Sequence, residues 1–131
     1  MTLQITLSED GPHSGDYSTN VADAISQGVR VLNHALRRGG IEQPADAAYI
    51  ISDLALAAHG LEQLCDQFSS YFVTELAAGR LGLWSEREGT VETAVEETTL
   101  ALGLSASLAS QLGRQLDAAR NLCDGLEGVG E

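Results

Sequence analysis

The chain has 131 residues, 44 % of them hydrophobic, and a formal net charge of −12, which suits one folded domain with its own core. All 7 cations are arginines and only Arg37 and Arg38 are adjacent, so the clustered positive charge of nucleic-acid-binding proteins is missing. No stretch approaches the ~20 apolar residues of a membrane-spanning helix, and the N-terminus does not have a signal-peptide pattern. We expect a soluble, cytoplasmic, bacterial protein that binds neither nucleic acid nor membrane.

Residues 1–18 differ from the rest of the chain and predict an N-terminal arm. Residues 2–7 alternate polar and apolar side chains, as a short β-strand does, and residues 8–18 are polar and rich in turn formers. Because the chain offers this strand no partner strand, we interpret the segment as an extended or flexible arm. The alternative is an arm that adds to the sheet edge or the helices of another chain.

Apolar periodicity predicts a first helix over residues 20–38 and a second over residues 44–78. Thr19 or Asn20 can cap the first helix, and Pro44 suits the first position of the second. The apolar positions of the second helix follow one another in steps of three and four, which is typical of a coiled-coil seam. They are Ala47, Ile51, Leu54, Ala58, Leu61, Cys65, Phe68, Phe72 and Leu76.

A third helix is predicted to begin at Ser85, because Ser85-Glu86-Arg87-Glu88 fits the capping box; a start at Thr90 is the alternative. It continues to about Leu126, and residues 127–131 are expected to form a flexible tail. Its stripe keeps the heptad spacing and comprises Val91, Val95, Thr98, Leu102, Ser105, Leu108, Leu112, Leu116, Ala119, Leu122 and Leu126.

These elements predict an all-α fold: a single antiparallel helical-bundle domain over residues 19–126, with a long hairpin of the second and third helices and the shorter first helix packed at its base. Gly60 and Gly103 could break the long helices, but we expect both helices to be continuous. With a turn centred near residue 82, Gly60 would face residue 104, so the two glycines would lie at one height, where the backbones could approach closely.

The tip of this hairpin, residues 64–100, lies beyond the reach of the first helix, which at 1.5 Å per residue is only about 30 Å long. Four of the six aromatic residues fall between Phe68 and Trp84. Apolar side chains that two helices cannot cover are typical of an interaction surface; the alternative is that the arm or a folded-back helix covers them. The predicted interaction residues are Phe68, Tyr71, Phe72, Leu76, Leu81, Leu83, Trp84, Val91 and Val95.

No catalytic, cofactor or metal site is predicted. Cys65 and Cys123 would lie about 36 Å apart on the expected hairpin, so we expect unlinked thiols. His13, His34 and His59 have no partner at a metal-ligand spacing, and no phosphate-binding loop or nucleophile motif occurs. We therefore expect a non-enzymatic protein that acts by helix–helix association, as a homodimer or an adaptor subunit. A small-ligand-binding bundle is a further alternative.

Another alternative comes from the turn Leu83-Trp84-Ser85-Glu86 and from two Tyr-x3-Asp/Glu patterns, Tyr71 to Glu75 and Tyr49 to Asp53. A helical hairpin with tryptophan in its turn resembles the WXG100 proteins of type VII secretion. The resemblance covers residues 44–126 in shape, and Glu86 stands where the Trp-x-Gly motif of the family has glycine. It implies a small, dimeric, secreted helical substrate.

Overall fold

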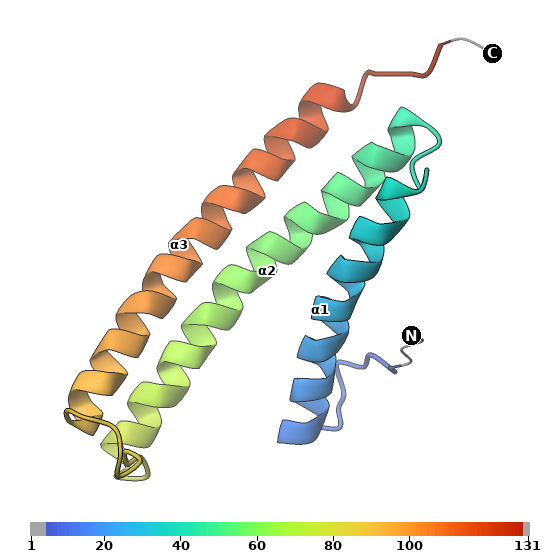
Figure 1. Ribbon diagram of the computed structural model, residues 1–131. Coiled ribbons are helices and arrows are strands. Elements are labelled where there is room, and N and C mark those ends of the chain that lie inside the picture. The colour runs from blue at the N-terminus through green and yellow to red at the C-terminus, as the bar shows by residue number, and fades with distance from the viewer. Residues whose placement is uncertain (1–4, 130–131) are drawn as a thin grey trace. The chain divides into compact units, whose positions relative to one another are not determined.

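The computed structural model describes residues 5–129, which contain the helices α1 (Gly15–Arg37), α2 (Pro44–Ala77) and α3 (Val91–Cys123) (Figure 1). Helices make up 72 % of the described residues, and no strand occurs among them, so the all-α prediction is confirmed. The chain divides into two compact units, Met1–Glu42 and Gln43–Glu131. The packing of the first helix at the hairpin base and the single domain over residues 19–126 stay predictions.

In the first unit, α1 begins at Gly15, earlier than the predicted start at residue 20. Ser14 caps the helix, because its hydroxyl accepts a hydrogen bond of 3.2 Å from the backbone N–H of Tyr17. The Tyr17 hydroxyl in turn donates to the Thr6 carbonyl and accepts from the Ser8 N–H, both at 2.9 Å. The predicted arm is therefore shorter and is tied to the first turn of α1. Residues 5–7 form no strand, and residues 2–4 of the predicted strand lie outside the described part.

In the second unit, α2 and α3 form the predicted antiparallel hairpin. The predicted limits of α2 are confirmed within one residue, with Pro44 in the first turn. The predicted capping box at Ser85 is wrong, and the alternative start at Thr90 is confirmed: the Thr90 hydroxyl accepts from the Thr93 N–H at 3.1 Å. Gly89 explains the difference, because its φ of +97° is a left-handed conformation that cannot continue a helix back to Ser85.

Gly60 and Gly103 lie inside unbroken helices, as predicted. Their predicted close approach is wrong, because a Cβ atom added at either glycine would have no neighbour within 4 Å. His59 lies instead beside Gly113 and Asp117, whereas a turn centred on residue 82 would place it level with residue 105. The register is shifted because α3 begins at Val91, so the connection takes up residues that the prediction assigned to the third helix.

Gly60→Ala and Gly103→Ala are each expected to raise the free energy of unfolding by about 0.5–1 kcal/mol, because alanine costs less conformational entropy inside a helix. Both sites have the open space that a Cβ needs. Denaturant unfolding followed by circular dichroism measures the change. A loss of stability at either position would mean that another surface covers it.

The seam between α2 and α3 is the row of positions that the two helices turn toward each other, and each of its residues is buried or half-buried. On α2 it comprises Ala48, Ile51, Ala55, Ala58, Glu62, Cys65, Ser69, Phe72 and Leu76. On α3 it comprises Val95, Thr99, Leu102, Ala106, Ala109, Gly113, Leu116, Arg120 and Cys123. The steps alternate between three and four on both helices, as in a coiled coil.

Small residues form the best-buried part of this seam. Ala55 and Ala58 are 1 % and 2 % exposed, and none of the described large side chains is fully buried. The predicted α2 stripe included Leu54 and Leu61, yet these are exposed by 37 % and 42 %. The seam on α2 thus lies partly one residue away from the predicted stripe, because the small side chains allow the two helices to approach each other.

Candidate interaction surface

The connection at the hairpin tip leaves α2 through a glycine-dependent cap. The Arg80 N–H donates to the Glu75 carbonyl and the Gly79 N–H to the Leu76 carbonyl, both at 3.0 Å. With a φ of +73° at Gly79, this is a Schellman motif. The apolar contact that often accompanies the motif is replaced by an ion pair, in which the Arg80 guanidinium binds the Glu75 carboxylate at 2.5 and 3.1 Å.

This ion pair lowers the pKa of Glu75, mainly through the hydrogen bonds from Arg80. A lowered pKa in the folded state means that the ion pair contributes stability above the ordinary pKa of 4.5, and that this contribution is lost as the pH falls through the lower folded value.

Arg80→Gln is expected to return the pKa of Glu75 toward its ordinary value, which NMR titration of the carboxyl carbon measures. An unchanged Glu75 titration in the variant would contradict the paired geometry.

The nine predicted interaction residues divide into two groups. Phe68, Tyr71 and Trp84 are exposed, by 51 %, 58 % and 86 %. The other residues are buried or half-buried, so they stabilise the hairpin; Phe72, Leu76 and Val95 lie in the seam, and Leu81, Leu83 and Val91 lie at or next to the connection. The Tyr71 and Phe72 rings pack edge to face, with centroids 5.3 Å apart. Contact of the exposed group with a partner stays a prediction.

A second row of apolar side chains runs beside the seam and is exposed. Each member directly precedes a seam residue, as Leu54 precedes Ala55 and Phe68 precedes Ser69. On α2 the row comprises Leu54, Leu61, Leu64, Phe68 and Tyr71, which are exposed by 37 to 58 %. On α3 it comprises Leu108, Leu112 and Leu122, which are exposed by 50 to 83 %. We call these two rows together the apolar face.

Helix geometry places both rows on one side of the hairpin. Successive residues of an α-helix are about 100° apart, so the position before a seam residue points sideways from the seam. Because α2 and α3 run in opposite directions, this displacement takes both rows to the same side. His59 and Asp117 test this geometry, since each directly follows a seam residue. Their side chains meet on the other side of the hairpin, where His59 Nε2 donates to Asp117 Oδ2 at 2.9 Å.

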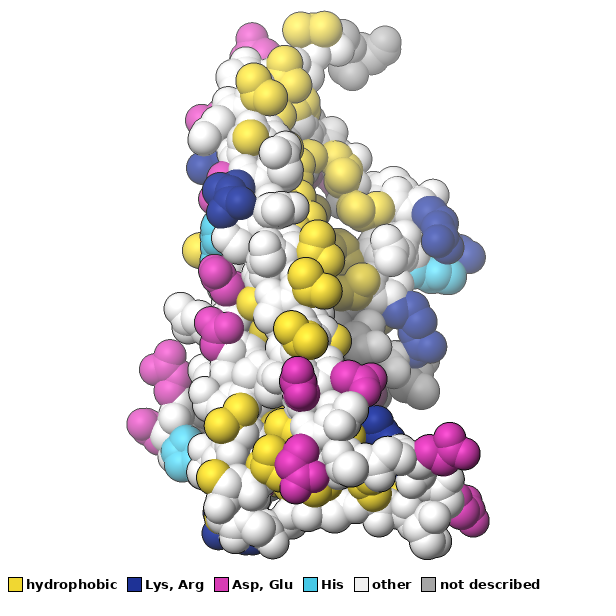
Figure 2. All heavy atoms as spheres, turned by 90° about the vertical axis from the view of Figure 1, so that its left-hand side faces the viewer, with side chains coloured by type: hydrophobic (Ala, Val, Ile, Leu, Met, Phe, Trp, Pro, Cys, Tyr) yellow, Lys and Arg dark blue, Asp and Glu magenta, His cyan; other side chains and the backbone are white. Residues whose placement is uncertain are grey.

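The side opposite the apolar face carries both polar groups and exposed apolar residues, which are Tyr49, Leu56, Val73 and Leu100. His59 and Asp117 lie there, and Arg114 donates to the Ser110 hydroxyl at 2.8 Å nearby. Figure 2, which views the molecule from the α3 side, shows hydrophobic side chains running along its length and acidic side chains beside them.

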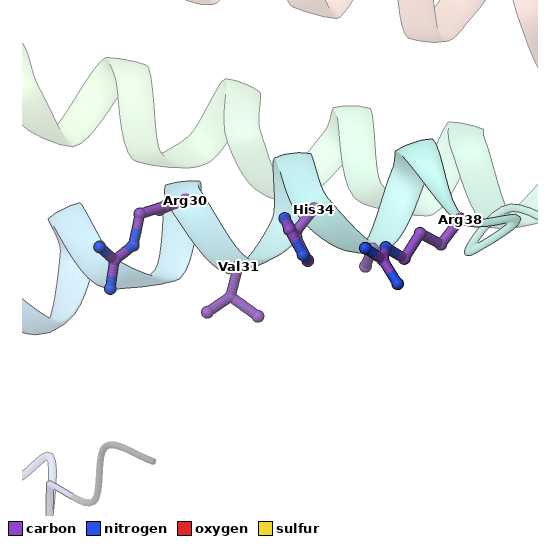
Figure 3. A pocket seen from close by; sticks show the side chains of 5 residues that line it. Arg30, Val31, His34 and Arg38 are labelled. Atoms are coloured by element: carbon purple, nitrogen blue, oxygen red, sulfur yellow. The ribbon is translucent and has the colours of Figure 1, made fainter. Parts of the chain in front are cut away.

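In the first unit, α1 carries a basic stripe. Arg30, His34 and Arg38 follow at intervals of four residues and, with Val31 and Ala35, line a shallow hollow (Figure 3). The Arg30 side chain also bonds to Gln27. None of the residues of α1 is buried. The stripe stands out in an acidic chain, but it holds too few cations for a nucleic-acid surface.

Other chemistry is sparse among residues 5–129. Cys65 and Cys123 are half-buried free thiols, and His59 is held by Asp117. The described side chains form no group of three or more His, Cys, Asp or Glu suited to a metal ion. No helix in this part of the chain is both long enough and apolar enough to cross a bilayer.

Comparison with known proteins gave no match, either to a protein-family model or to a curated protein or solved structure. The hairpin thus offers two exposed surfaces, the aromatic tip and the apolar face.

Proposed function

We propose that this protein is a non-enzymatic helical hairpin that acts by protein–protein association through its tip. The main observation is Trp84, the only tryptophan, which is 86 % exposed in the connection. Exposed tryptophan and tyrosine are enriched at the centres of protein interfaces, since one such side chain buries a large area with little loss of conformational entropy.

A further observation supports this proposal, and the free thiols bear on the compartment. Phe68 and Tyr71, in the last part of α2, are exposed by 51 % and 58 %, so the aromatic surface extends from the connection onto the helix. The thiols of Cys65 and Cys123 are free, as is usual in the reducing cytoplasm, where we place the protein.

Trp84 provides its own test, because it is the single tryptophan. In the isolated chain its fluorescence should be quenched freely by iodide or acrylamide. In the assembled complex, whether with itself or with a partner, quenching should fall and the emission should shift to the blue. A Trp84 that stays fully quenchable in the complex would exclude the tip as the contact.

Trp84→Ala should weaken association by at least about 30-fold, the effect of losing a hot spot worth about 2 kcal/mol. The free energy of unfolding should change by less than about 0.5 kcal/mol, because the side chain is exposed. Phe72→Ala is the matched comparison: it removes a seam residue and should destabilise the hairpin. Equal effects of both variants on stability would argue that the tip is core.

The second candidate is a WXG100-like secreted substrate, favoured by the observed hairpin with Trp84 in its connection. In this case export from the cell should depend on Tyr71 or Glu75. Because Glu75 is engaged by Arg80, Glu75→Gln should be tested beside Arg80→Gln, which breaks the same ion pair. Export lost only in the Glu75 variant would favour a secretion signal.

A further inference from the structure

We propose that the apolar face of the hairpin is an interface with a second copy of this chain, so that two hairpins form a four-helix bundle. This inference rests on the proposed association function and names the partner. The apolar face runs along α2 and α3 from Leu54 to Leu122; it shares Phe68 and Tyr71 with the tip surface but does not include Trp84.

The first argument is that the hairpin does not bury its own large side chains. Its best-buried positions are small, such as Ala55 and Ala106, at 1 % and 7 % exposure. The leucines that could form a core are on the apolar face, where Leu108 and Leu112 are 63 % and 50 % exposed. The larger seam residues, such as Phe72 and Leu102, are only half-buried, so the seam gains a limited hydrophobic stabilisation and the exposed leucines need a cover.

The second argument is the charge pattern. The positions that directly precede a seam residue carry no Asp, Glu, Lys, Arg or His between residues 47 and 71 of α2 or between residues 94 and 122 of α3; the next such position on α2 is Glu75, which is paired with Arg80. In the whole chain 20 % of residues are charged, so the charges of both helices are confined to their other surfaces. Depletion of charge is typical of interface cores. It also makes the surface self-complementary, because two copies of a strongly acidic chain can meet here without repulsion.

The third argument is size. From the exposed fractions, the large side chains of the apolar face present on the order of 700–800 Å². A standard interface takes about 800 Å² from each partner. At 1.5 Å per residue the face spans about 26 Å on α2, from Leu54 to Tyr71, and about 21 Å on α3, from Leu108 to Leu122, whereas α2 as a whole has 34 residues. The hairpin of a second copy has the required length.

The test compares Leu108→Glu with Leu100→Glu. Both leucines are on α3 and equally exposed, by 63 % and 64 %, but only Leu108 belongs to the apolar face. Light scattering after gel filtration should give a dimer mass for the wild type and for Leu100→Glu. Leu108→Glu should raise the dissociation constant of the dimer by at least about 100-fold, which corresponds to about 2.7 kcal/mol of binding free energy. This variant should therefore be a monomer at concentrations at which the wild type is a dimer. A monomer mass for the wild type would overturn the proposal. In that case α1 of the same chain or another protein would cover the apolar face. Equal behaviour of the two variants would also overturn the proposal.

A second measurement does not depend on the variants being folded. The melting temperature of a dimer rises with protein concentration, so the wild type should melt later at 100 µM than at about 1 µM. A constant melting temperature contradicts the dimer. Trp84→Ala separates the two proposals: a dimer that persists in this variant while other association is lost supports both. If Trp84→Ala affects no association and the dimer persists, the tip proposal fails and the apolar-face proposal stands.

Discussion

Ala55→Leu is expected to lower the free energy of unfolding by about 2–3 kcal/mol. Ala55 is 1 % exposed in the seam of α2 and α3, so the added carbon atoms have no space unless the helices move apart. Such a movement also loosens neighbouring seam contacts, such as those of Ala58, which is 2 % exposed. Denaturant unfolding followed by circular dichroism, at one fixed protein concentration, measures the change.

Ala118→Leu is the matched control, because Ala118 is an exposed residue of α3 outside both the seam and the apolar face. The same change in volume should alter the free energy of unfolding there by less than about 0.5 kcal/mol. If Ala55→Leu were as harmless as Ala118→Leu, Ala55 would not face α3 and the seam assignment would be wrong.

The helices themselves could be predicted from the sequence, but the phase of the seam on α2 could not. Leu54 and Ala55 both belong to rows that repeat every seven residues. A hydrophobic pattern shows that such rows exist, and the larger side chain marks the stronger row. Which row turns toward the other helix depends on how closely the backbones approach. Here alanine allows the closer approach, so the leucines are left on the apolar face.

The candidate surface was also predicted only in part, because the sequence does not show which row of side chains turns toward the other helix. Trp84 and Phe68 were identified correctly as exposed aromatic residues, because two helices have no place to bury them. Val95 was included with them but is 7 % exposed in the seam. Leu108 and Leu112 were assigned to the predicted stripe of the third helix, and their exposure became visible only once the register was known. The register depends on the left-handed Gly89, whose conformation a sequence pattern does not reveal.

Gly113 and His59 determine that register, and a double-mutant cycle can test it. A Cβ atom at residue 113 would lie 2.6 Å from His59 Cε1, so Gly113→Ala forces the imidazole out of its position and away from Asp117. The half-exposed imidazole can swing away, which loses its hydrogen bond to Asp117, worth about 0.5–1.5 kcal/mol, while alanine in place of a helical glycine returns about 1 kcal/mol. We expect the two effects to cancel, with a net change in the free energy of unfolding of about 0.5 kcal/mol or less.

In a His59→Ala background the obstacle is gone, and Gly113→Ala should then stabilise the protein by about 0.5–1 kcal/mol, as predicted for Gly60→Ala, where the added Cβ has open space. The larger stabilisation in the His59→Ala background is the decisive result. Asp117→Asn serves as the control, because it removes the charge of the hydrogen-bond partner but leaves the imidazole above Gly113. If Gly113→Ala stabilised the wild type as much as the His59→Ala variant, His59 would not lie over Gly113. The two rows of the apolar face would then no longer be placed level with each other, and the arrangement that the dimer requires would fail with them.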